Sequence, residues 1–422
     1  MAVAITNELE TSTVSPPSLE NNNIEVSVVM PCLNEGETVG TCVRKAVRAL
    51  RDASIRGEVI LADNGSTDGS IAIAEQEGAR VIHVSSRGYG NALMGGIRAA
   101  RGQYVIMGDA DDSYDFLEVP KFVVALRQGH DLVQGCRLSS GGGTVKRGAM
   151  PWLHYWIGNP LFSWMARLMF LAPVHDIYCG MRGFTRELFD RLGLQCAGME
   201  FATEMIIKAS LFHHRVHEVP ITLWPDGRKE GRPHLRTFRD GWRTLRFFLL
   251  FSPRWLFWYP GWMLVGFGMI GYAIALPGVT IGGITFDIHT LMVSSMVLQL
   301  GFQSIAFAVL TQTYAINQRF RPQSPRVDQF FEYFTLERGA MLGLGAIAVG
   351  VVAIMAAVVQ WYHAGFGTLE YASTMRLVIP GATLVVLGAS TILNSFLCSM
   401  LGLNRRYSLG PAPAEVPASS HQ

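Results

Sequence analysis

The chain has 422 residues, of which 49% are hydrophobic and only 16% are charged, and its formal net charge is +2. These values exclude a disordered chain, a collagen-like repeat and a small disulfide scaffold, and the near-neutral charge argues against a dedicated nucleic-acid-binding protein. The six cysteines contain no Cys-x-x-Cys pair, which is typical of reduced thiols in a cytoplasmic protein.

The two ends of the chain are polar. Residues 1–23 are rich in Ser, Thr, Asn, Pro and Glu and lack an apolar core, so we expect a disordered leader rather than a signal peptide. We expect residues 405–422 to form a flexible tail for the same reason.

Residues 26 to about 133 have the pattern of an α/β domain, which we expect to extend over residues 24–236. Short apolar runs alternate with stretches of helical period, of which residues 38–50 are one. The predicted strands are Val26–Met30, Val59–Ala62, Arg80–Val84, Tyr104–Met107 and Leu132–Gln134. Strands joined by helices predict right-handed crossovers and a mostly parallel, Rossmann-like sheet that binds ligands at the carboxyl ends of its strands.

Polar motifs follow three of these strands. Residues 109–112 (Asp-Ala-Asp-Asp) place three carboxylates within four positions, a donor set that suits Mg²⁺ or Mn²⁺, although a solvated turn that caps the next helix is the alternative. Asp63 and Asn64 could hydrogen-bond a base or ribose, or simply belong to a glycine turn. The loop at Gly90 could bring backbone N–H groups near a phosphate, or be structural.

Two segments before the apolar half of the chain are expected at a membrane surface. In residues 148–175 the one Asp, Glu, Lys or Arg is Arg167, and the Trp and Tyr rings at positions 152, 155, 156 and 164 favour an interfacial position at headgroup depth. Residues 237–255 form a basic amphipathic helix of the kind that anchors to lipid headgroups. Just upstream, Arg228, Arg232 and His234 could bind an anionic ligand.

Residues 256–404 contain four runs without Asp, Glu, Lys or Arg, and each is long enough to cross a bilayer. The predicted transmembrane helices are 256–276, 288–316, 340–362 and 377–403. Arginine is abundant in alternate connections, which predicts that the amino-terminal domain and both termini are cytoplasmic, at a bacterial inner membrane or its equivalent.

Five motifs together resemble glycosyltransferase family two, in the branch that acts on polyisoprenyl phosphates and is typified by dolichyl-phosphate mannose synthase. They are Pro31-x-x-Asn34-Glu35, the Asp-Asn-Gly-Ser-Thr-Asp-Gly run at 63–69, Asp109-Ala110-Asp111, Gly135-Cys136-Arg137 and the Asp-Ile-Tyr-Cys-Gly-Met-Arg run at 176–182. The resemblance covers residues 24–250 and implies a GT-A fold for the catalytic domain.

The resemblance also implies roles for individual residues. Together with Gly90, the expected donor-binding set is Pro31, Asn34, Glu35, Asp63, Asn64, Asp109, Ala110 and Asp111. Asp109 and Asp111 would hold Mg²⁺ or Mn²⁺. The expected catalytic set is Asp111, Asp176, Arg137 and Arg228, with Asp176 orienting the sugar or the acceptor. The lipid phosphate would be bound by Arg228, Arg232 and His234.

Three positions depart from the family pattern. Asn64 stands where a second Asp is usual, which leaves the preference for the base open, and Ser113 stands where mannose synthases have a Gln metal ligand. His234 stands where a Lys is usual, so the charge at this position depends on pH.

The expected reaction is the inverting transfer of one sugar from a UDP- or GDP-sugar to dolichyl or undecaprenyl phosphate. A phosphate monoester is largely a dianion at neutral pH, so the acceptor needs no strong general base. A processive polysaccharide synthase is one alternative, but Arg254-Trp255 lacks the Gln of the Gln-x-x-Arg-Trp motif. A non-catalytic membrane transporter or scaffold is another, and a homo-oligomer is left open.

Overall fold

The computed structural model describes residues 24–228, 237–318 and 320–408. They divide into two compact units. The first contains residues 24–163, 173–209 and 214–228, and the second contains residues 164–172, 210–213 and the described residues from 237 onward.

The first unit is built on a seven-stranded sheet with the strand order β3-β2-β1-β4-β7-β5-β8. The strands are β1 Val26–Cys32, β2 Gly57–Asp63, β3 Arg80–His83, β4 Tyr104–Met107, β5 Leu132–Cys136, β7 Arg182–Thr185 and β8 Val216–Pro220. All pairs are parallel except those of β7, which runs antiparallel to both β4 and β5. The predicted mostly parallel α/β sheet is therefore confirmed, with one antiparallel strand that the sequence pattern did not predict.

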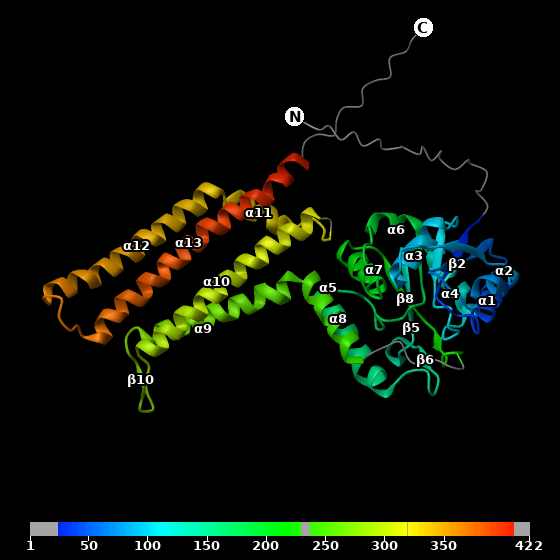
Figure 1. Ribbon diagram of the computed structural model, residues 1–422, viewed down its shortest axis with the longest axis horizontal. Helices are drawn as coiled ribbons and strands as arrows, with labels where there is room; N and C mark the ends of the chain where they lie inside the picture. Colours follow the sequence, from blue (N-terminus) through cyan, green and yellow to red (C-terminus); the bar gives the residue numbers. More distant parts are fainter. Residues whose placement is uncertain (1–23, 229–236, 319, 409–422) are drawn as a thin grey trace, which may run out of the picture. The chain divides into compact units, whose positions relative to one another are not determined.

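Helices connect the strands along the chain (Figure 1). They are α1 Val39–Asp52, α2 Ser70–Gln76, α3 Tyr89–Ala99, α4 Val119–Arg127, α5 Asn159–Phe170, α6 Arg186–Leu192 and α7 Glu200–Leu211. The core is apolar because β1, β2 and β4 are buried along almost their whole length. Two short strands, β6 Thr144–Val145 and β9 Thr222–Leu223, pair with each other beside the main sheet. All six cysteines are free thiols.

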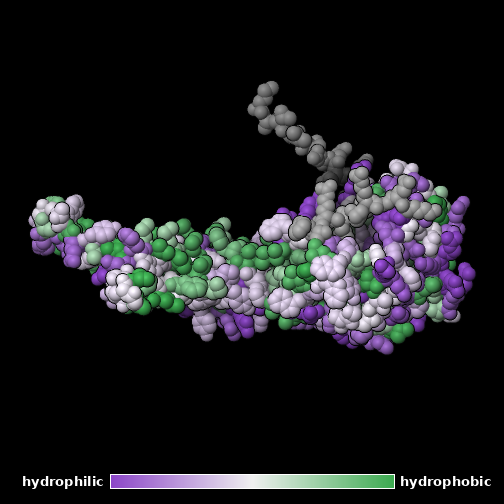
Figure 2. Space-filling model, turned by 90° about the horizontal axis from the view of Figure 1, so that it is seen from below, coloured by the Kyte–Doolittle hydropathy of each residue, from purple (hydrophilic) through white to green (hydrophobic). Residues whose placement is uncertain are grey.

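The second unit is helical. Its helices are α8 Thr237–Phe251, α9 Tyr259–Ala275, α10 Ile288–Asn317, α11 Pro325–Tyr333, α12 Leu336–His363 and α13 Tyr371–Ser408. A short hairpin of β10 Thr280–Ile281 and β11 Ile284–Thr285 joins α9 to α10. The long helices pack in the order α9, α10, α13, α12 (Figure 1), and apolar side chains cover them (Figure 2).

Glycines allow α12 and α13 to approach closely. A Cβ atom on Gly350 would lie 2.5 Å from the carbonyl oxygen of Gly381, and one on Gly343 would lie 2.6 Å from that of Gly388. Contact between small residues is a common way to pack helices in a bilayer, where no hydrophobic effect drives them together.

Three helices of the described residues are long and apolar enough to cross a membrane, and they are α10, α12 and residues 371–402 of α13. They correspond to the second, third and fourth predicted spans. The prediction of four spans is therefore only partly met. In the first predicted span, a π-helical turn over Arg254–Trp258 precedes α9, and α9 alone has 17 residues, at the short end of what spans a bilayer.

Candidate active site

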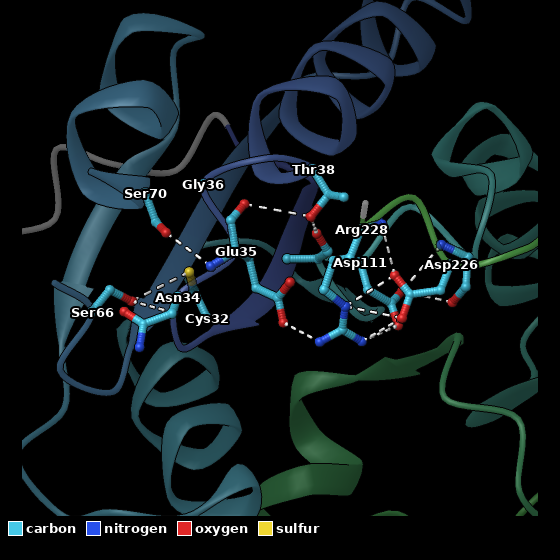
Figure 3. Close-up of polar contacts among 12 residues, drawn as sticks. Cys32, Asn34, Glu35, Gly36, Thr38, Ser66, Ser70, Asp111, Asp226 and Arg228 are labelled. Atoms are coloured by element: carbon cyan, nitrogen blue, oxygen red, sulfur yellow. Dashed lines mark hydrogen bonds and ion pairs between the residues drawn. The ribbon is translucent and has the colours of Figure 1, made fainter. Parts of the chain in front are cut away.

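The loop after β1 is fastened to the loop after β2. The backbone N–H groups of Asn34 and Glu35 donate to Ser66 Oγ and Ser70 Oγ over 3.0 and 2.9 Å. Asn34 Oδ1 accepts a hydrogen bond from the Thr67 N–H at 2.8 Å, so this side chain connects the two loops. Among these residues, the Glu35 carboxylate is the group that points toward Asp111 and Arg228 (Figure 3).

Asp63 closes β2 and is held in its ionised form. Its carboxylate accepts hydrogen bonds from the N–H groups of Gly65 and Ser66 at 3.1 and 3.0 Å. Burial opposes ionisation, but the hydrogen bonds outweigh it and keep the pKa of Asp63 below its usual value. Pro31, which we also expected near the donor, lies in β1 beside Ala62 of β2.

Both the nitrogen and the oxygen of the Asn64 side-chain amide form hydrogen bonds within the protein. Its Nδ2 donates to the carbonyl oxygens of Val84 and Ser86 at 2.9 and 2.8 Å, and its Oδ1 accepts from the Gly88 N–H at 2.8 Å. An aspartate could not donate the first two bonds. Asn64 therefore holds the loop before α3 in place, which gives a physical reason for its departure from the family pattern and argues against a direct role in binding a base.

The Gly90 backbone lies against a neighbouring loop. Its N–H donates to the Ala197 carbonyl oxygen at 2.8 Å, and a Cβ atom here would lie 2.1 Å from the carbonyl oxygen of Cys196. This N–H group is therefore used within the protein, and a contact between Gly90 and the donor stays a prediction. Gly90 is small because a neighbouring loop passes directly over it.

Tyr89 of the same loop reaches the acidic motif. Its hydroxyl donates to Asp109 Oδ1 at 2.7 Å. Burial, together with the negative charge of Asp111, raises the pKa of Asp109 to about 6, while the Tyr89 hydrogen bond and the charge of Arg137 act in the opposite direction. Ala110 between the two aspartates is buried, and its carbonyl oxygen accepts the Thr38 hydroxyl at 2.7 Å.

Arg228 lies among three carboxylates (Figure 3). Its guanidinium nitrogens are 2.6 Å from Asp226 Oδ2, 3.2 Å from Glu35 Oε1 and 3.5 Å from Asp111 Oδ2. The other oxygen of Asp111 accepts both the N–H and the hydroxyl of Ser113, at 3.0 and 2.6 Å. The structure therefore brings together the acidic motif after β4, the loop after β1 and the basic segment after β9, residues separated by as many as 193 positions in the sequence.

Glu35 has an unsatisfied oxygen at this place. Burial, together with the negative charges of Asp111, Asp226 and Asp109, raises the pKa of Glu35 to about 7, although the charge of Arg228 acts in the opposite direction. Its Oε2 atom is buried and has no hydrogen-bond partner. A buried carboxylate oxygen without a partner is costly, and the one guanidinium of Arg228 is shared by three carboxylates, so negative charge is in excess here.

Arg137 and Asp176 form a buried ion pair. Asp176 is completely buried and accepts from Arg137 Nε at 2.7 Å, from Nη2 at 2.9 Å and from the Arg137 N–H at 3.1 Å. Arg137 Nη1 approaches the Tyr114 hydroxyl, which accepts the Gly180 N–H at 2.8 Å. The expectation that Asp176 contacts the sugar or acceptor does not fit this burial, because Arg137 occupies both of its oxygens.

A second buried ion pair was missed by the sequence analysis. Lys208 Nζ lies 2.8 Å from Glu204 Oε1, and both side chains are 1% exposed. The Glu204 carboxylate accepts the N–H groups of Gln195 and Cys196 at 2.8–3.2 Å. This pair fixes the loop that covers Gly90. A Glu and a Lys four residues apart on a helix indicate a surface pair, so no sequence signal would have revealed their burial.

Other expected residues cannot be placed. Arg232 and His234 lie outside the described residues. Among the residues that the structure describes, no three His, Cys, Asp or Glu side chains come close enough together to hold a metal ion by themselves.

Comparison with known proteins identifies both parts of the chain. Residues 27–193 match the family description "Glycosyl transferase family 2", and residues 309–402 match "Glycosyltransferase family 2 C-terminal transmembrane region". A glucosyl-3-phosphoglycerate synthase from Mycobacterium tuberculosis, solved with Mn²⁺ and UDP, is a distant structural neighbour. It has a TM-score of 0.42 and 23% identity, over 54% of this chain and 78% of that one.

Curated relatives are closer. The low-salt glycan biosynthesis hexosyltransferase Agl6 of Haloferax volcanii is 36% identical over 89% of this chain and 89% of its own length. The dolichyl-phosphate hexose transferase of the same organism is 33% identical over 51% of this chain and 89% of its own length. These matches agree with the α/β sheet and the apolar helices described above. The chain therefore belongs to glycosyltransferase family 2 and is a membrane-bound glycosyltransferase with a GT-A catalytic domain.

Proposed function

We propose that this enzyme transfers a single hexose from a nucleotide-sugar to a polyisoprenyl phosphate, with inversion at the anomeric carbon. Support comes from a relative named as a dolichyl-phosphate hexose transferase, which the chain matches over 89% of that protein's length. The transmembrane helices add support, because a lipid-linked acceptor must be met at a membrane.

The observation that carries the proposal is the position of Arg228 against Asp111 and Glu35. A sugar transfer to a phosphate brings two anionic groups together, the diphosphate of the donor and the phosphate of the acceptor. Without ligands, Arg228 is shared by carboxylates. We infer that it turns to the acceptor phosphate during the reaction, because a guanidinium binds a phosphate with two parallel hydrogen bonds.

The residues present fit a divalent cation. Asp109 and Asp111 supply oxygen ligands, and the raised pKa of Asp109 indicates a place that lacks positive charge. Two carboxylates are enough, because Mg²⁺ is usually bound by one or two carboxylates together with substrate phosphates and water. Such an ion, when bound, would neutralise charge on the leaving diphosphate.

The chain's own groups have separate tasks in this scheme. The acceptor phosphate oxygen attacks the anomeric carbon, the bond from that carbon to the diphosphate oxygen breaks, and the electron pair leaves on the nucleoside diphosphate. No base is required, because the acceptor is already ionised. Tyr89 orients Asp109, and Asp176 is a positioning residue that orients Arg137.

The sidedness of the reaction follows from the connecting segments. Residues 277–287 contain no Lys or Arg, whereas residues 319–338 contain four Arg. We therefore propose that the catalytic domain and both termini are cytoplasmic. Exposed Trp156, Trp164 and Leu171 around α5 fit the expected interfacial position of residues 148–175, which stays a prediction.

Membranes that contain the enzyme test this function directly. They are incubated with UDP- and GDP-hexoses, undecaprenyl or dolichyl phosphate, and Mg²⁺ or Mn²⁺, and the lipid extract is analysed. We expect a lipid carrying one sugar, and Arg228→Gln should raise KM for the lipid phosphate more than KM for the donor. Chains of several sugars would instead indicate a processive synthase, and the absence of turnover would favour a scaffold or transporter.

A further inference from the structure

Two arginines meet at one end of the α9–α10 helix pair. Arg254 begins the π-helical turn that leads into α9, and Arg321 lies just after the end of α10. Hydrogen bonds hold the backbone of this segment against the end of α10. The N–H groups of Phe320 and Arg321 donate to the Ala315 carbonyl oxygen at 2.9 and 3.2 Å. The rings of Phe251 and Phe320 pack with centroids 6.0 Å apart, which holds the two segments together.

Within the described ranges, one nitrogen of the Arg321 guanidinium has no hydrogen-bond partner. This atom, Nη1, is buried. Burial, and to a lesser extent the positive charge of Arg254, lowers the pKa of Arg321 to about 10. Among the described residues no carboxylate lies within ion-pair distance of Arg321 or Arg254. A partly buried guanidinium beside a second cation is energetically unfavourable unless an anion joins them.

The neighbouring side chains indicate where that anion comes from. Trp258, Tyr259 and Trp262 follow Arg254 on the π-helical turn and α9, and all three are exposed. Exposed Trp and Tyr at the end of apolar helices are typical of the headgroup level of a bilayer. An arginine pair at this level is therefore placed to meet the phosphate of a lipid, which a guanidinium binds in a bidentate manner.

We propose that Arg321 and Arg254 form a binding site for the phosphate group of a membrane lipid, within the helical unit and separate from the residues of the candidate active site. The occupant is a lipid phosphate, either the monoester of a polyisoprenyl phosphate or the diester of an anionic phospholipid. The site does not depend on which acceptor the enzyme uses, so it stands or falls separately from the proposed function.

The test uses thermal unfolding of the full-length enzyme in detergent. The purified protein is titrated separately with undecaprenyl phosphate, phosphatidylglycerol and inorganic phosphate, because a ligand that binds the folded state raises the Tm. We expect at least one of the two lipids to stabilise the wild type and inorganic phosphate to have no effect at the same concentration. The lipid that acts identifies the natural occupant.

Variants then locate the effect. Arg321→Gln should weaken the effective lipid about tenfold or more, as expected for the loss of charge-assisted hydrogen bonds. Arg326→Gln, which removes an exposed arginine of α11, is the matched control and should behave like the wild type. Should Arg321→Gln fail to fold, Arg254→Gln removes the exposed member of the pair and should also weaken binding.

Three results would overturn the proposal. They are an unchanged lipid response in both Arg321→Gln and Arg254→Gln, an equal loss in Arg326→Gln, and stabilisation of the wild type by inorganic phosphate as strong as that by lipid. The first would show that the pair does not bind the lipid, the second that only net charge matters, and the third that the site takes free phosphate.

Discussion

Replacing Asp176 by Asn removes one charge from a completely buried ion pair. Asp176 accepts three hydrogen bonds from Arg137, at 2.7, 2.9 and 3.1 Å, and Arg137 itself is nearly buried. The variant would leave an uncompensated guanidinium in the protein interior. Breaking a buried ion pair in this way costs about 3–5 kcal/mol of unfolding free energy. For a domain of this size the Tm should fall by about 10 °C.

A double variant separates stability from catalysis. Arg137→Met combined with Asp176→Leu removes both charges, and such apolar replacements of buried pairs are often neutral for stability. We expect the Tm to recover most of what Asp176→Asn loses. Sugar transfer should not recover, because Arg137 is absent from its place near Asp109.

Thermal unfolding of the detergent-solubilised full chain and hexose transfer to lipid are measured on the same preparations. The reasoning is refuted if Asp176→Asn unfolds at the wild-type temperature, since the Arg137–Asp176 ion pair would then contribute nothing measurable to the free energy of unfolding. It is also refuted if the double variant transfers sugar at the wild-type rate, since Arg137 would then have no part in the reaction.

Three further predictions concern groups around the acidic motif. Tyr89→Phe should weaken Mn²⁺ affinity about tenfold with an unchanged Tm, because Asp109 loses an orienting hydrogen bond; Mn²⁺ titration by electron paramagnetic resonance measures this. The pKa values of Glu35 and Asp109 are raised to about 7 and about 6 in the folded protein. Protonation of these two carboxyl groups therefore stabilises the fold at low pH, and this contribution is lost as the pH rises through those values. The Tm without metal should fall between about pH 4.5 and 7, and Mg²⁺ should restore it most at the upper end. Glu204→Gln should lower the Tm by about 10 °C because the buried Lys208 ammonium loses its carboxylate partner.

Each of these predictions has a contrary outcome. Equal Mn²⁺ affinity in Tyr89→Phe would show that the hydroxyl does not orient a ligand. A metal-free Tm that rises over this pH range would reverse the sign argued for the two carboxyl groups. A wild-type Tm in Glu204→Gln would mean that the buried pair does not hold the loop over Gly90.

Much of the α/β domain could be predicted because its signals are local. The predicted strand Tyr104–Met107 coincides with β4, and the predicted strand Val26–Met30 lies within β1. Strand β7, Arg182–Thr185, was not predicted, because four residues that include Arg and Gly carry no periodicity. Its position between β4 and β5 depends on long-range pairing, which a local sequence pattern does not reveal.

In the candidate site, too, some features could be predicted from the sequence and others could not. The family resemblance placed Asp111 and Arg228 in one catalytic set, and in the structure the two side chains lie 3.5 Å apart. The sequence pattern could not show which polar groups would form hydrogen bonds within the protein. Asn64 and Gly90 have the residue types of a ligand site, yet their polar groups are used by neighbouring loops. Burial in the folded state, rather than residue type, decides which groups stay available to a substrate.

The most direct measurement compares Asp111→Asn with Asp112→Asn in lipid-linked hexose formation. Asp112 is a matched control, since it pairs with Lys45 at 2.7 Å and has a positive φ of 60° that Asn tolerates well. We predict that Asp111→Asn reduces transfer about 100-fold or more, as for other groups that stabilise developing charge, while Asp112→Asn stays within a few-fold of the wild type. Wild-type transfer by Asp111→Asn would contradict the account.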